Sequence, residues 1–137
     1  MVRGMAAVER GRALVGTRFV AQGRDPETGV DCVGLALHAF AIGRHTVPDD
    51  YRLSGDHRAT ILGGVAPLFR RVPRLNPVPG DMLLLKPGAR QWHLGIWTGG
   101  GLLHADARRR MVVERPGAPE WPVAAAFRAR VRKTKEG

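Results

Sequence analysis

The sequence contains one cysteine and no long apolar run. A single cysteine excludes an intramolecular disulfide and a zinc site built on several thiolates. No stretch approaches the roughly 18 consecutive apolar residues of a membrane span, and the first residues lack the apolar stretch of about 7–15 residues that marks a signal peptide. We therefore expect a protein that is made in the cytoplasm, with no membrane span and no disulfide framework.

Acidic and aromatic residues are also scarce. Twelve acidic residues stand against 22 basic ones, so the formal net charge is +10, and aromatic residues make up 6%. A basic chain attracts anionic polymers of several kinds, so charge alone identifies no partner. With few aromatics and no recognisable binding motif, we expect no specific nucleic-acid partner. Part of the excess charge lies in residues 108–110 and in the tail, where solvated positions are the simplest interpretation.

The first half of the chain predicts helices. Apolar residues at helical spacing predict a helix over residues 5–16, followed by a loop over 17–30. Asp31 is a good N-cap, and apolar residues at spacings of three and four follow it, so a second helix with one buried flank begins there. A third helix is expected from Asp56 toward Phe69.

The second half predicts short strands. Apolar runs of four to seven residues, separated by glycine, proline or charged residues, predict an antiparallel meander. These runs cover residues 82–86, 92–98, 101–106 and 111–115, and a last strand is expected at about 126–132. Helices followed by an antiparallel sheet predict one α+β domain over residues 1–137, with a basic tail at about 132–137.

Cys32 is the first candidate for chemistry. It follows the proposed cap at the first turn of a helix, where free N–H groups and the helix dipole favour a thiolate. The neighbouring Asp31 opposes this unless its carboxylate is occupied as the cap. A lone cysteine is otherwise most often a small buried apolar residue.

A thiolate nucleophile needs a base, and histidine is the usual one. His93 and His104 lie inside apolar strands on either side of a glycine-rich turn, whereas the other three histidines do not: His38, His45 and His57. A two-residue turn at 98–99 would place the two side chains directly opposite each other. A turn at 99–100, or a four-residue turn at 98–101, would make them diagonal neighbours on the same face. Either register predicts one imidazole bonded to the other, which with Cys32 gives a nucleophile, a base and an orienting residue.

Five segments in this order resemble the motifs of the NlpC/P60 cysteine peptidases across about residues 8–115. They are VGTRF at residues 15–19, DCVGL at 31–35, PGDMLLL at 79–85, HLGIWTG at 93–99 and LHA at 103–105. The resemblance implies a papain-like α+β fold in which the cysteine opens a helix packed on an antiparallel sheet. It implies hydrolysis of amide bonds in peptidoglycan stem peptides by Cys32, His93 and His104, with no metal and no cofactor.

The resemblance extends to a subgroup, the cell-wall peptidases of phage tails and gene transfer agents. Those proteins also tend to carry a bulky apolar residue after the cysteine, as Val33 does here. It implies phage-tail or gene-transfer-agent proteins as partners and release inside a particle. Three positions depart from the family motifs: Phe19 replaces a tyrosine, Arg18 a proline, and Val33 a serine.

Residues around these motifs are candidates for binding substrate. We expect Phe19, Asp31, Trp92 and Trp97 to line or shape the cleft, although strand packing is the simpler interpretation of the two tryptophans. Asp106 shares a face with His104 and could contact it or form a turn. Three arginines are weaker candidates for meeting substrate carboxylates: Arg18, Arg24 and Arg90.

Three other interpretations stay open. The chain could be an inactive tail or particle component that keeps the fold and binds the cell wall. Its charge could serve nucleic acid instead. Cys32, His93 and His104 could together hold zinc with one open position.

Overall fold

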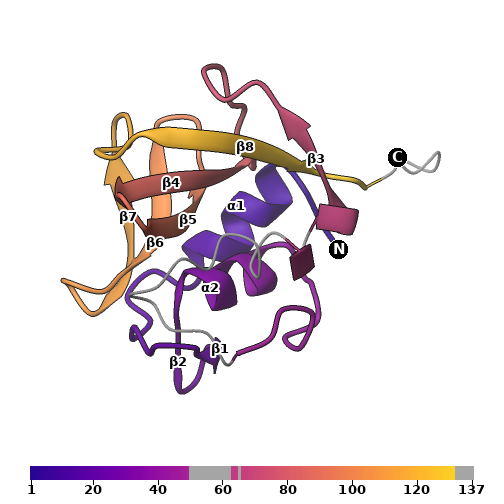
Figure 1. Cartoon of the computed structure of the whole chain (residues 1–137). Helices are drawn as coiled ribbons and strands as arrows, with labels where there is room; N and C mark the ends of the chain where they lie inside the picture. The colour runs from indigo at the N-terminus through magenta and orange to yellow at the C-terminus, as the bar shows by residue number, and fades with distance from the viewer. Residues whose placement is uncertain (50–62, 65, 132–137) are drawn as a thin grey trace.

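The computed structural model describes residues 1–49, 63–64 and 66–131. Two helices, α1 (Met5–Arg12) and α2 (Cys32–Ala39), pack on a six-stranded antiparallel sheet (Figure 1). The sheet strands are β3 (Phe69–Val72), β4 (Met82–Gly88), β5 (Gln91–Trp97), β6 (Gly101–Asp106), β7 (Met111–Pro116) and β8 (Val123–Ala129). A two-stranded ribbon, β1 (Arg24–Asp25) and β2 (Gly29–Val30), and a 3-10 turn, η1 (Ala66–Leu68), complete the described elements. The predicted α+β class is confirmed.

The sheet order is β3-β8-β4-β5-β6-β7. The predicted meander is confirmed from β4 to β7, whose strands pair with their chain neighbours. The last strand begins earlier than residue 126 and pairs with β4, on the side of the meander away from β7. This places the C-terminal strand between β4 and the edge strand β3, which the sequence analysis did not predict.

One helix boundary was predicted wrongly, and another predicted helix lies largely outside the described residues. The helix expected over residues 5–16 ends at Arg12, and turns closed by backbone hydrogen bonds continue to Thr17. The helix expected from Asp56 toward Phe69 falls partly on residues 50–62 and 65, which lie outside the described residues. Residues 63–64 are helical and η1 leads up to Phe69, as a helix running toward Phe69 requires; Phe69 itself begins β3, where it is buried against Phe40.

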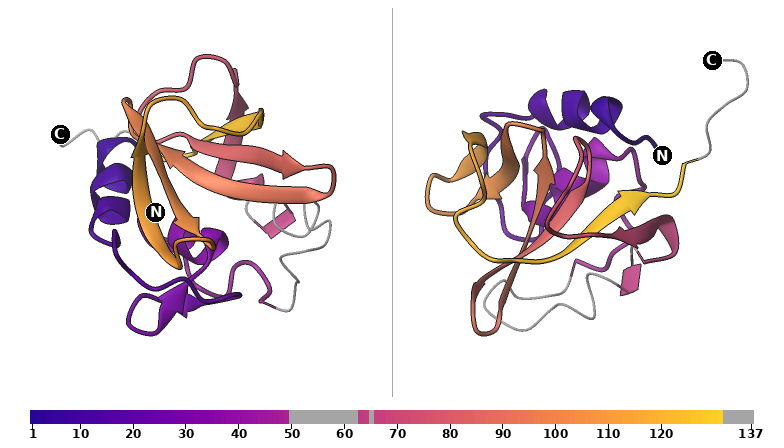
Figure 2. Two further views of the ribbon diagram at one scale, coloured as in Figure 1. Left: turned by 90° about the vertical axis from the view of Figure 1, so that its left-hand side faces the viewer. Right: turned by 90° about the horizontal axis from the view of Figure 1, so that it is seen from above.

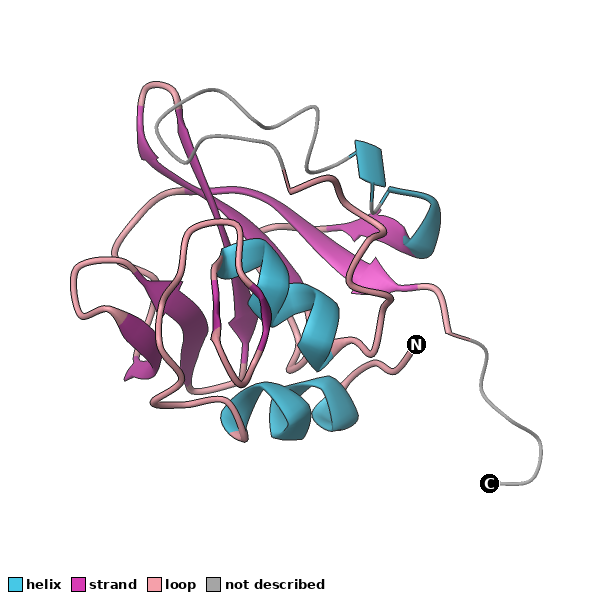
Figure 3. Ribbon diagram, turned by 90° about the horizontal axis from the view of Figure 1, so that it is seen from below, coloured by secondary structure: helices cyan, strands magenta, loops and turns pink. Residues whose placement is uncertain are grey.

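The helix α2 begins where the sequence predicted. The Asp31 carboxylate accepts a hydrogen bond from the Gly34 N–H and so caps it. Every residue of α2 except His38 is buried, so the expectation of one buried flank was too modest. Besides the sheet, α1 and β1 pack against α2, and the two helices lie side by side (Figure 3).

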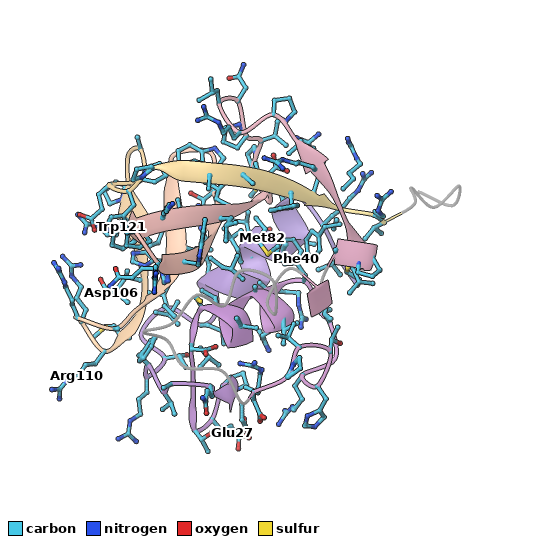
Figure 4. The ribbon with its side chains drawn as sticks, viewed as in Figure 1. Glu27, Phe40, Met82, Asp106, Arg110 and Trp121 are labelled. Atoms are coloured by element: carbon cyan, nitrogen blue, oxygen red, sulfur yellow. The ribbon has the colours of Figure 1, made fainter. Side chains whose placement is uncertain are left out.

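Apolar residues cover both faces of the sheet. Met82 and Leu84 of β4 face the helices, where Phe40 and Met82 lie between α2 and the strands (Figure 4). On the opposite face lies a second group, which we call the far-side cluster. It comprises Val72, Leu83, Leu85, Leu102 and Ala126, with Trp97, Trp121 and Val123 packed against it. Of the described helices, none is both long and apolar enough to cross a membrane.

Candidate active site

Cys32 is the first residue of α2 and is 4% exposed. Burial, followed by the nearby charge of Asp31, raises the pKa of the Cys32 thiol to about 12. Backbone hydrogen bonds from Leu94 and Val33 act in the opposite direction and favour the thiolate, but they are the weaker influence. The thiol is therefore protonated at neutral pH, so the helix start alone does not generate the expected anion.

His93 and His104 are brought together by the hairpin of β5 and β6. Ile96 pairs with Leu103 and Trp97 with Leu102, so the turn lies at residues 99–100. This register, and not the one with a turn at 98–99, makes the two histidines diagonal neighbours on one face. His93 Nε2 lies 3.0 Å from His104 Nδ1, and the two rings are perpendicular. The His93 Nδ1 atom takes no part in this contact.

The cysteine approaches this pair where the sheet separates. The strands β5 and β6 pair only next to their turn, at Ile96 and Trp97, whereas β6 and β7 pair along their whole length. The β4–β5 hairpin diverges from the β6–β7 hairpin (Figure 2). The backbone of Leu94, in the part of β5 that does not pair with β6, forms a hydrogen bond with the Cys32 sulfur. Among the described residues no hydrogen bond joins this sulfur to His93, but both residues line the same cleft.

Both imidazoles are uncharged at neutral pH. Burial, and next the neighbouring His104, lower the pKa of His93 to about 3, although Asp106 opposes this shift. Burial also lowers the pKa of His104, again against the influence of Asp106. The resting site therefore holds a neutral thiol and two neutral imidazoles rather than an ion pair.

The cleft has a volume of about 720 Å³, large enough for a peptide segment. Its lining includes Phe19, Cys32, Trp92, His93 and His104. On one side lie charged residues from β6, β7 and the segments that follow them: Asp106, Arg108, Arg109, Arg115 and Glu120. Arg109 pairs with Asp106 at 2.7 Å and Arg115 with Glu120 at 3.1 Å, so this wall is charged but largely paired.

The residues expected to contact substrate divide into two groups. Phe19 and Trp92 line the cleft. Trp97 does not line the cleft and packs against the far-side cluster. Asp31 is completely buried, and its carboxylate accepts hydrogen bonds from the backbone of Gln22 and Gly34 and from Arg24. Asp31 is therefore held as a cap and ion-pair partner rather than presented to a ligand.

The weaker arginine candidates lie outside the cleft lining. Arg24 is buried against Asp31 at 3.1 Å, and neither Arg18 nor Arg90 lines the cleft. The lining arginines are instead Arg109 and its neighbour Arg108, together with Arg115 of β7.

Asp106 lies in a turn, which was one of the two roles considered for it from the sequence. Its carboxylate accepts hydrogen bonds from the backbone of Arg108 and Arg109 and from the Arg109 guanidinium. Burial raises the pKa of Asp106, but the hydrogen bonds from Arg109 and Arg108 outweigh it and hold the pKa below its ordinary value. Asp106 is therefore ionised near both imidazoles.

Trp121 was not among the residues expected at the site. It precedes β8 and lies with its ring 5.4 Å from that of His93 and 5.5 Å from that of His104. Trp121 and Asp106 occupy the same side of the molecule, while Arg110 projects outward from the turn after β6 (Figure 4). In the sequence, Trp121 is a lone aromatic residue between two prolines in a polar segment. This pattern does not predict a place at the site unless the strand order is known.

The zinc interpretation gains no support from the geometry. Among the residues that the structure describes, no group of three or more histidine, cysteine, aspartate or glutamate side chains could hold a metal ion. His93 Nε2 and His104 Nδ1 bond to each other, so these two ring nitrogens are not available as metal ligands.

Solved structures with a similar fold are NlpC/P60 domains. The NlpC/p60 domain of peptidoglycan hydrolase SagA is 25% identical, with a TM-score of 0.56 over 95% of this chain and 100% of that one. The peptidoglycan hydrolase RipB from Mycobacterium tuberculosis is 24% identical, with a TM-score of 0.57 over 95% of this chain and 65% of that one. NlpC1 from Trichomonas vaginalis is 18% identical, with a TM-score of 0.61 over 88% of this chain and 41% of that one.

These similarities establish that the chain has the fold of NlpC/P60 domains. No model of a protein family and no curated protein sequence matches the chain. The chain spans less than half the length of the two Trichomonas vaginalis proteins, NlpC1 and NlpC2.

Proposed function

We propose that the protein is a cysteine peptidase that hydrolyses amide bonds in peptidoglycan stem peptides. One observation carries the proposal: Cys32 and the bonded pair His93 and His104 meet in a single cleft. The fold is shared with domains of peptidoglycan hydrolases, which supports the substrate class.

The neutral resting site defines how the first step proceeds. As the Cys32 sulfur attacks the amide carbonyl, its proton moves to Nδ1 of His93, the nitrogen not bonded to His104. For Nδ1 to accept this proton, His93 Nε2 must carry hydrogen and donate it to His104 Nδ1. His104 thus selects the tautomer of His93, and the ionised Asp106 nearby stabilises the imidazolium that forms.

The later steps return the site to its starting state. The backbone N–H of Cys32, at the start of α2, would stabilise the oxyanion. His93 then gives its proton to the departing amine as the carbon–nitrogen bond breaks, leaving a thioester on Cys32. Water attacks the thioester while His93 takes its proton, and the thiolate is reprotonated as the acid leaves.

Digestion of purified muropeptides, read by mass spectrometry, tests the proposal. We expect cleavage by the wild type, none by Cys32→Ala or His93→Ala, and slower cleavage by His104→Ala. His45→Ala is the matched control, since His45 is exposed and does not line the cleft. Equal cleavage by Cys32→Ala and the wild type would exclude Cys32 as the nucleophile.

A second candidate is a protein that binds the cell wall without cutting it. The burial and raised pKa of Cys32 favour this candidate, because a protonated thiol is a poor nucleophile. Pelleting with intact sacculi separates the two functions. Equal retention of wild type and Cys32→Ala, with no fragments released by the wild type, would support the binding role.

The finer assignment to phage tails or gene transfer agents rests on the sequence resemblance, including the apolar Val33 after the cysteine. Immunodetection in purified particles tests this part of the proposal. Protein found only outside particles would contradict it without affecting the peptidase chemistry.

A further inference from the structure

We propose that Trp121 is a positioning residue for the histidine pair, holding both imidazoles in place and keeping water from them. Its relevance to catalysis rests on the proposed peptidase function, but its effect on the imidazoles does not. Nothing in the sequence resemblance assigns this residue a role.

The three rings form a closed triangle. The centroid distances are 5.1 Å between the histidines, 5.4 Å from Trp121 to His93 and 5.5 Å from Trp121 to His104, with interplanar angles of 90°, 86° and 87°. Edge-to-face contacts at these separations are favourable for aromatic rings. Because each ring touches the other two, neither imidazole can rotate without losing a contact with the indole.

The residues on each side of Trp121 contact strands of the sheet. Glu120 pairs with Arg115 of β7 at 3.1 Å, and the Pro122 carbonyl accepts a hydrogen bond from the Lys86 N–H of β4. Pro122 also restricts the backbone of the residue before it to extended conformations. The indole is therefore held against the histidine pair by attachments to two strands of the sheet.

Trp121 also limits access of water to the pair. It lines the main cleft and a separate cavity of about 30 Å³, and His104 lines both. A cavity of this size holds about one water molecule. Truncation of the indole would open this region and hydrate both imidazoles, whose low pKa values arise first from burial.

Charged groups from several elements face the pair. Asp106 of β6 raises both histidine pKa values, and Glu120 raises that of His104. Arg109 and Arg115 lower the pKa of His104. Cys32 of α2 lines the same cleft as an uncharged thiol. None of these charges is removed by a substitution at Trp121, so a change in histidine pKa would report hydration and position.

The experiment is a pH titration of the imidazole NMR signals in the full chain. We expect both histidine pKa values below 6.5 in the wild type and raised by about one unit or more in Trp121→Ala. Trp121→Phe, which keeps a ring, should show a smaller rise. Trp97→Ala is the matched control, because it removes an indole from the same far-side cluster, and the described ring contacts of both histidines are with Trp121 and not with Trp97.

A Trp121→Ala protein that unfolds cooperatively and keeps wild-type histidine pKa values would overturn the proposal. An equal rise in Trp97→Ala would also overturn it, because the effect would then come from general loosening. If Trp121→Ala does not fold, Trp121→Leu keeps an apolar side chain without the ring and is interpreted by the same criteria.

Activity gives a second readout. In Trp121→Ala the acid limb of the pH profile of kcat/KM should move to higher pH together with the His93 pKa. A wild type that cleaves no muropeptide would refute the proposed function, while the NMR titration would still decide the role of Trp121.

Discussion

At the scale of single residues, the site is built from groups kept neutral by burial. Cys32 has a pKa of about 12 and His93 one of about 3, so the thiol and the base are both uncharged over a wide pH range. A helix start favours a thiolate, but desolvation and Asp31 outweigh it here. Under the proposed peptidase function, the nucleophile would therefore form during attack on the substrate, by proton transfer from Cys32 to His93.

The same burial makes the protein sensitive to acid. Below about pH 6.5, His93 and His104 bind protons in the unfolded chain but remain neutral in the folded protein. The free energy of unfolding therefore rises with pH between about 3 and 6.5, and falls on acidification by an amount on the order of a few kcal/mol. Denaturant unfolding at pH 7, 5.5 and 4.5 would measure this loss.

A matched variant identifies its source. His93→Gln should lose less stability than the wild type between pH 6.5 and 4.5. Asp106 and Glu114, whose pKa values lie below their ordinary values, lose their contributions only at lower pH, below about 4. An identical slope in His93→Gln and the wild type would refute this assignment.

At the scale of elements, the start of α2 depends on Asp31. Its buried carboxylate caps the helix and pairs with the buried Arg24. Asp31→Ala should cost about 3–5 kcal/mol, because it leaves a charged guanidinium and a helix N–H without this partner. Asp31→Asn keeps an acceptor for Gly34 and should cost less. Chemical denaturation measures both, and equal losses would show that the charge rather than the cap matters.

The hairpin that carries His104 depends on a close approach at Gly101. A Cβ atom there would lie 2.3 Å from the Arg115 carbonyl oxygen of β7. Gly101→Ala should therefore destabilise the fold by about 1–3 kcal/mol and disturb the register that sets the histidine pair. Gly100→Ala is the control, because its Cβ would meet nothing within 4 Å, and its effect should stay within about 0.5 kcal/mol. Thermal unfolding of the two variants makes the comparison, and equal stability would contradict it.

The features that the sequence predicts well are those determined by residues close together in the chain. The cap at Asp31 and the even-length turn after Trp97 are local, and they suffice to put Cys32 at a helix start and His93 and His104 on one face. Trp121 and the separation of β5 from β6 depend on contacts between distant segments. The same holds for β3, whose partner β8 lies more than 50 residues along the chain. Trp97 lies on the same face of β5 as His93, so strand alternation alone could not exclude it from the cleft.

At the scale of the whole molecule, the excess of positive charge favours binding to anionic polymers. The formal net charge is +10, and β3 at the edge of the sheet carries Arg70 and Arg71, both exposed. Arg128, opposite Arg70 on β8, is paired with Asp81. The edge strand therefore presents positive charge away from the cleft, and under the proposed function this charge would attract an anionic cell wall.

This distribution predicts binding that weakens with salt. Retention of Cys32→Ala on isolated sacculi should fall between about 0.05 and 0.5 M salt, because screening shortens the reach of exposed charges. Replacing Arg70 and Arg71 with glutamine lowers the charge by two and should reduce both retention at low salt and its salt dependence. Replacing Arg12 and Glu114 with glutamine removes an exposed ion pair without changing net charge, and it should leave retention unchanged. Retention that is independent of salt would show that the cleft, rather than the charge of the molecule, holds the protein on the wall.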